Sequence, residues 1–166
     1  MSNNSVIGVL IPLHASGATI AMLLGAWNLR RNPKGDRPHR LVGRVWVVAM
    51  YWTVLSSFFI KELTPGHFSW IHGLSAFTFV TLSIGLWAAL THRVETHRRF
   101  MTGSYFGLLG AFAGAVAVPS RDIPQWLVHE PLGLAVAAAA CLLVAAAVIA
   151  ASRRRRAAKT PAPVEP

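Results

Sequence analysis

The chain has 166 residues, of which 54% are hydrophobic and only 13% are charged. This charged fraction is about half that of an average soluble domain, so the composition excludes an ordinary soluble fold and indicates a membrane protein. The net charge of +10 does not indicate a nucleic-acid partner, because the basic residues are divided among short segments beside apolar runs.

Five apolar runs follow one another along the chain, at residues 6–29, 41–60, 68–90, 100–118 and 132–151. A helix needs about 20 residues to cross about 30 Å of hydrocarbon, and in lipid only a helix satisfies the backbone of a single segment. We therefore predict an all-α bundle of five transmembrane helices within residues 1–152. Residues 153–166 are basic and proline-rich, which predicts a disordered cytoplasmic tail.

The basic residues predict the orientation of this bundle. If the amino terminus faces outward, fourteen of the sixteen Lys and Arg residues lie on the inner side, and only Lys61 and Arg121 lie outside. Basic loops are retained on the cytoplasmic side of membrane proteins and are attracted to anionic lipids of the inner leaflet. The carboxyl terminus is therefore expected inside, with the lipid bilayer as the main partner.

Four histidines recur with the same spacing in the two halves of the predicted bundle. His14 and His39 are 25 residues apart, and so are His72 and His97. Two explanations fit this spacing, a coincidence and a duplication of one helical hairpin. Under the second explanation the fold is two parallel hairpin repeats plus a fifth helix.

Ionisable side chains in or beside membrane spans are candidates for function, because they are costly there. His14 and His72 are expected in the outer leaflet, and His39 and His97 at the inner boundary. Paired imidazoles between four helices are typical of b-type cytochromes, which predicts haem b as a cofactor and these four residues as its ligands. The alternative is that each histidine only makes a hydrogen bond to a neighbouring helix or to headgroups.

Small residues follow two helical faces near these histidines. One face holds Gly17, Ala21 and Gly25 beside His14, and the other holds Gly103, Gly107, Gly110 and Gly114. Such stripes are either slots for a flat ring or surfaces where two helices pack closely, and close packing is the commoner role. We therefore expect leucine at position 107 or 110 to force helices apart.

Two motifs resemble a known family. The stretch "LHASGATIAMLLGAWNLRRNPKGDRPHRLVGRVW" and the later "HRRFMTGSY" are similar to the domain-of-unknown-function 2306 family of predicted bacterial multi-pass membrane proteins. The resemblance implies a bacterial inner-membrane location and supplies no activity. Family members typically carry an arginine where this chain has Gly103, which weakens the expectation of an anion site at the second motif.

Three classes of function remain open from the sequence. The leading hypothesis is a haem-binding or redox-linked membrane protein. The second is a non-enzymatic protein that acts by lipid or protein contacts, with anionic headgroups gripped by Arg40, Arg44, Arg98 and Arg99. The third is a small transporter subunit that forms a homo-oligomer. No Cys-x-x-Cys, His-Glu-x-x-His or Walker motif is present, so no catalytic residue is predicted.

Overall fold

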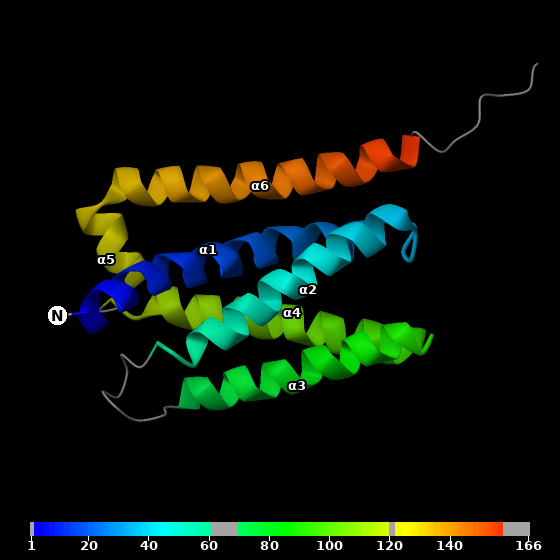
Figure 1. The fold of residues 1–166 in the computed structure, drawn as a ribbon, viewed down its shortest axis with the longest axis horizontal. Coiled ribbons are helices and arrows are strands. Elements are labelled where there is room, and N and C mark those ends of the chain that lie inside the picture. Colours follow the sequence, from blue (N-terminus) through cyan, green and yellow to red (C-terminus); the bar gives the residue numbers. More distant parts are fainter. Residues whose placement is uncertain (1, 61–69, 120–121, 158–166) are drawn as a thin grey trace, which may run out of the picture.

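The computed structural model describes residues 2–60, 70–119 and 122–157 of the chain. These residues form an all-helical bundle, as the apolar runs predict (Figure 1). The helices are α1 (Ser2–Arg30), α2 (Arg37–Ser57), α3 (Trp70–Leu90), α4 (Val94–Ala117), α5 (Asp122–His129) and α6 (Pro131–Ala157).

Two helical hairpins make up most of the bundle. α1 packs most extensively on α2, and α3 packs most extensively on α4. α2 also contacts α3, and α1 contacts α4, so these four helices form a closed ring. α6 lies against α1 and α2 on the outside of this ring (Figure 1). Within the described residues, no Cα atom of α2 lies within 8 Å of one in α4, so these two helices face each other across the ring.

The basic connections gather at one end of the bundle. The α1–α2 turn, the α3–α4 turn and the carboxyl end of α6 lie together, opposite the amino terminus and α5 (Figure 1). Because successive long helices run in alternating directions, connections that are far apart in the sequence reach the same end. The charge asymmetry in the sequence is therefore also an asymmetry in space.

Four of the described helices are long and apolar enough to cross a membrane, at Ile7–Arg30, His72–Leu90, Val94–Ala117 and Pro131–Arg154. They correspond to the first, third, fourth and fifth predicted spans. α2, which holds the second predicted span, does not reach the same hydropathy. It begins at Arg37 and includes Arg40 and Arg44, and these arginines lower its mean hydropathy.

Helix boundaries differ from the sequence predictions at several points. The connection between the last two predicted spans was expected to be a loop, but it contains the short helix α5. α4 begins at Val94, before the apolar run that starts at residue 100, because the charged residues ahead of this run are helical as well. α6 continues through the first basic residues of the predicted tail to Ala157, and residues 158–166 lie outside the described residues.

The core lies between the four helices of the ring, and Ala145 of α6 also belongs to it. Leu24 of α1, Val42 and Met50 of α2 and Leu82 of α3 are almost completely buried, and Trp46 is 5% exposed. Many large apolar side chains elsewhere on the helices are exposed, in contrast to a soluble bundle. Such a surface is stable when hydrocarbon surrounds it, because lipid tails are as apolar as the side chains.

The two glycine faces have different roles. On α1, a Cβ atom at Gly17 would lie 2.5 Å from Trp52 Cδ1, and one at Gly25 would lie 2.5 Å from Tyr105 Cδ2. These glycines therefore allow aromatic side chains of α2 and α4 to approach the backbone. The prediction of a close-packed stripe on α4 was wrong. Nothing in the described residues lies within 4 Å of a Cβ atom built at any of its glycines, which are Gly103, Gly107, Gly110 and Gly114.

We expect Gly25→Ala to destabilise the bundle by about 1–3 kcal/mol, because the added methyl group would overlap the Tyr105 ring. Gly110→Ala is the matched control, since it adds the same methyl group in open space on another helix. It should leave stability unchanged or raise it slightly through helix propensity. Unfolding in a fixed detergent would measure both, and an equal effect of the two substitutions would contradict this packing.

Candidate functional site

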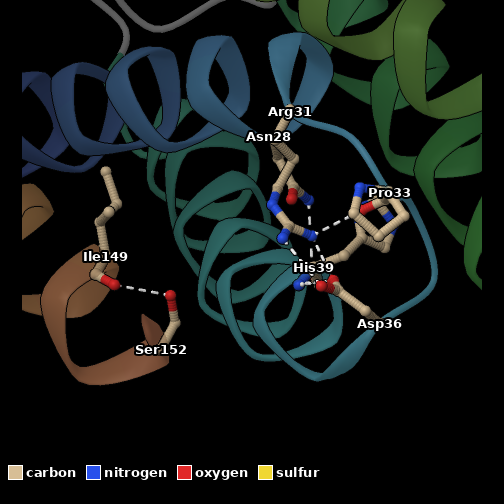
Figure 2. Close-up of polar contacts among 7 residues, drawn as sticks. All are labelled: Asn28, Arg31, Pro33, Asp36, His39, Ile149 and Ser152. Atoms are coloured by element: carbon tan, nitrogen blue, oxygen red, sulfur yellow. Dashed lines mark hydrogen bonds and ion pairs between the residues drawn. The ribbon is translucent and has the colours of Figure 1, made fainter. Parts of the chain in front are cut away.

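A network of polar contacts fixes the turn between α1 and α2. The Arg31 guanidinium forms an ion pair with Asp36 and donates a second hydrogen bond, 2.9 Å long, to the Pro33 carbonyl oxygen. The Asp36 carboxylate also accepts a 3.0 Å bond from the His39 backbone N–H, so Asp36 caps the amino terminus of α2 (Figure 2). An aspartate cap satisfies a backbone donor that the helix itself leaves unpaired. This network sets the position of His39.

The His39 imidazole is half-buried at the start of α2, before the predicted span. Its Nδ1 atom is buried and has no hydrogen-bond partner among the described residues. The pKa of His39 is lowered from its usual value, mainly because the ring is buried. Repulsion from the charges of His97 and Arg31 lowers this pKa further. The Asp36 carboxylate acts in the opposite direction. A neutral ring at pH 7 follows, with a lone pair available on one nitrogen.

His97 lies in the first turn of α4, across the ring of helices from α2. Its Nδ1 atom lies 2.9 Å from the Gly85 carbonyl oxygen of α3. A carbonyl only accepts, so Nδ1 must carry the proton, and the lone pair of the neutral ring is then on Nε2. The Gly85 carbonyl therefore orients this imidazole in the way that backbone carbonyl groups orient many metal-binding histidines.

His39 and His97 both lie at the basic end of the bundle, at the starts of α2 and α4. They lie close enough for the charge of His97 to lower the pKa of His39. Two more buried polar atoms without a partner in the described residues are nearby in the chain, the Asn28 side-chain oxygen and Trp46 Nε1. Asn28 is tied to this site, because its amide donates a 3.4 Å hydrogen bond to the His39 carbonyl. Buried polar atoms without partners are rare in folded proteins, and ordered water or a ligand commonly satisfies them.

The outer pair of predicted ligands is arranged differently. His14 Nδ1 lies 2.8 Å from Ser56 Oγ, which itself donates its proton to the Trp52 carbonyl oxygen at 2.6 Å. His14 also lines a cavity of about 180 Å³ between the helices. His72 is buried, with its ring 6.2 Å from the Phe58 ring, and it is not one of the residues that line this cavity. The outer pair as haem ligands stays a prediction.

The candidate headgroup-binding arginines are all exposed at the basic end, at Arg40 and Arg44 of α2 and Arg98 and Arg99 of α4. None of them takes part in the ion pairs found among the described residues, where Arg31 pairs with Asp36. Their guanidinium groups are therefore available to external anions.

Sequence reasoning missed several residues of these sites. Asn28 and Ser56 are single polar residues within apolar runs, and nothing in their spacing marks them as partners of histidines. Their roles depend on contacts between helices, such as the His14–Ser56 bond across 42 residues of sequence. The one local signal was Asp36 followed by a proline near the first turn of α2, which is typical of a capped helix start.

We expect Asp36→Ala to lower the free energy of unfolding by about 1–2 kcal/mol, because α2 loses its cap and Arg31 loses its partner. Asp36→Asn keeps an oxygen that can accept from the His39 N–H and removes only the charge. It should therefore recover part of the loss. Denaturation of the two variants in one detergent tests this order, and equal losses would show that the cap contributes nothing.

Comparison with known proteins identifies the family. The family described as "Predicted membrane protein (DUF2306)" matches residues 11–152. No curated protein and no solved structure matches the chain. The matched range includes all four paired histidines and the capped turn at Asp36, and it confirms the resemblance of the two His-Arg motifs. The chain therefore belongs to the DUF2306 family of predicted membrane proteins.

Proposed function

We propose that the protein is a haem-binding, redox-linked protein of the bacterial inner membrane, with His39 and His97 as the two ligands of one haem b. The observation that carries this proposal is that both imidazoles lie at the same end of the bundle, His39 at the start of α2 and His97 in the first turn of α4, within range of electrostatic interaction. One of them has a buried nitrogen without a partner in the described residues, and the other is oriented by a backbone carbonyl group.

The number of available ligands favours haem over a metal ion held by the protein alone. Structural and catalytic zinc sites use three or four protein ligands. Among the described residues, no group of three or more His, Cys, Asp and Glu side chains could hold a metal ion. Two imidazoles are sufficient only where another molecule fills the remaining positions, as a porphyrin does.

The protein residues at this site would bind and tune the cofactor. The Gly85 carbonyl holds His97 in the tautomer whose Nε2 is free to coordinate, and it makes the ring more basic. Burial and neighbouring cations keep His39 neutral, which coordination requires. Lys34, whose charge acts on His39, would suit a carboxylate that haem carries, whereas Arg31 is already paired with Asp36. Bound haem would supply reversible one-electron transfer.

The inner pair is the better candidate for a first haem. The cavity beside His14 has a volume of about 180 Å³, whereas pockets for drug-sized ligands measure about 300–1,000 Å³. A porphyrin would need the outer helices to move apart. Near His39, by contrast, buried polar atoms on α1 and α2 have no partner among the described residues, and His97 of α4 lies at the same end of the bundle.

We also infer that α2 crosses the membrane, which gives five spans with the amino terminus outside. α2 has 21 residues, the same length as α3, and packs between α1 and α3. At 1.5 Å per residue, α2 is about 32 Å long, which is enough to span the hydrocarbon core of a bilayer. Its polar residues Thr53 and Ser56 are buried inside the bundle, away from lipid. The exposed arginines at the basic end would then bind anionic lipid headgroups of the inner leaflet.

A reporter fused after Pro166 tests the orientation. We expect a fluorescent protein that matures only in the cytoplasm to be active there, and a periplasm-dependent phosphatase at the same position to be inactive. Fusions after Pro119, between α4 and α5, should give the opposite pattern. Activity of the phosphatase at the carboxyl terminus would invert the topology and place His39 and His97 on the outer side.

An absorption spectrum tests haem binding. Protein purified from cells well supplied with haem should show a Soret band that shifts on reduction with dithionite. His39→Gln and His97→Gln should each weaken or abolish this haem spectrum, because glutamine lacks an imidazole nitrogen. The side-chain amide introduced by His97→Gln can still donate to the Gly85 carbonyl, so loss of colour would not reflect loss of that contact.

The matched control is His129→Gln, which removes an exposed histidine of α5 whose ring contacts Gln125 at 3.1 Å. It should leave the spectrum unchanged. A colourless wild-type protein that also fails to bind added haemin would refute the proposal. Action through lipid contacts at the exposed arginines would then be the better explanation.

A further inference from the structure

The cavity beside His14 lies at the end of the bundle opposite the basic turns. It is lined by residues of all four helices of the ring and by Ile123 of α5. Its polar lining consists of His14, Thr19, Thr53, Ser57, Ser75 and Thr78. On the α4 side the wall is Gly107, Ala111 and Ala115 together with Leu108 and Phe112. Several hydroxyl groups and one imidazole therefore border a partly open pocket whose walls are mainly apolar.

The hydroxyl protons of this lining are used inside the protein. Thr19, Thr53 and Thr78 each donate to a backbone carbonyl oxygen in the preceding turn, at 2.8, 2.9 and 2.8 Å. Ser57 Oγ lies 2.6 Å from the Val54 carbonyl oxygen and 2.7 Å from Ser75 Oγ, so its one proton is also used. A hydroxyl group that donates in this way still has lone pairs to accept a bond. The cavity walls consequently offer mainly acceptors.

His14 adds another acceptor. Because Ser56 gives its proton to the Trp52 carbonyl, its oxygen can only accept from His14 Nδ1. Nδ1 therefore carries the proton of the neutral ring, and Nε2 has the lone pair. The ring also interacts with the Thr53 backbone, a contact that suits the protonated nitrogen, and no hydrogen bond is assigned to Nε2 among the described residues. The imidazole can thus accept a bond from a molecule in the cavity.

We propose that this cavity binds a small neutral molecule with a hydroxyl or amine group that donates hydrogen bonds, on an apolar body about the size of one aromatic ring. The volume of about 180 Å³ exceeds that of an engineered protein cavity of about 150 Å³ that binds benzene. A cation fits less well, because the lining contains no carboxylate to balance its charge. A molecule that only accepts hydrogen bonds would face mainly acceptors on the walls, and two acceptors cannot form a hydrogen bond with each other.

Phenol is a suitable probe, with toluene and pyridine as controls of similar size. Toluene has no hydrogen-bonding group, and pyridine only accepts at neutral pH. In one fixed detergent, phenol should raise the melting temperature of the wild-type protein more than either control does. His14→Leu should weaken phenol binding about three- to tenfold, which is the usual effect of one lost hydrogen bond, and should leave toluene unaffected.

Two glycine substitutions provide a matched pair that does not alter any polar group. Leucine at Gly107 would extend into the cavity, whereas leucine at Gly110 would not, and neither site has a neighbour within 4 Å among the described residues. Gly107→Leu should abolish the phenol response, and Gly110→Leu should preserve it. Partition of the probe into the detergent is the same for both variants, so it cancels.

An equal response of the wild-type protein to phenol and toluene would overturn the proposal, and so would an unchanged phenol response in Gly107→Leu. The test is independent of haem, because His39→Gln and His97→Gln should keep the phenol response. A protein that binds phenol without haem would refute the proposed function alone, and a haem protein without the phenol preference would refute only this site.

Discussion

The contact of Asp36 with the first turn of α2 is the constraint on which the rest of the structure depends. It fixes where α2 begins, and the packing of α2 on α1 decides which of its faces points inward. Because each later residue follows at about 100° around the helix, Trp46, Met50 and Thr53 are then buried, one turn or two apart. The same rotation brings Ser56 to His14 at the far end. The capped start and the packed face of α2 together position polar groups at both ends of the bundle.

The two ends of the bundle offer different chemistry. At the basic end, His39 and His97 are neutral or oriented imidazoles beside polar atoms that have no partner in the described residues. At the other end, His14 and several hydroxyl groups surround a small cavity in which acceptors predominate. The separation follows from the antiparallel hairpins, since each helix pair carries one histidine towards each end. A redox centre and a small-molecule site would then lie on opposite sides of one membrane protein.

Small residues at equal spacing have unequal roles, and the partner helix decides between them. Gly17 and Gly25 of α1 face the aromatic rings of Trp52 and Tyr105, so their missing side chains allow close packing. The glycines of α4 meet no neighbour in the described residues, and of these only Gly107 reaches the cavity. In a membrane, a helix face can contact lipid tails instead of another helix. A small residue on that face therefore does not by itself indicate a helix–helix interface. This explains why the same pattern predicted packing correctly on one helix and wrongly on the other.

The sequence by itself determined the all-α class, the membrane setting and the family, because apolar runs of this length have no other stable form in lipid. The spacing of His39 and His97 from His14 and His72 also predicted that they begin helices at one end of the bundle, and they lie in the first turns of α2 and α4. Only the tertiary structure decided that Asn28 reaches the His39 carbonyl and that His14 bonds to Ser56. These contacts depend on how each helix is rotated about its axis and on how packed helices cross. Hydropathy is a mean over a segment and carries no information on either.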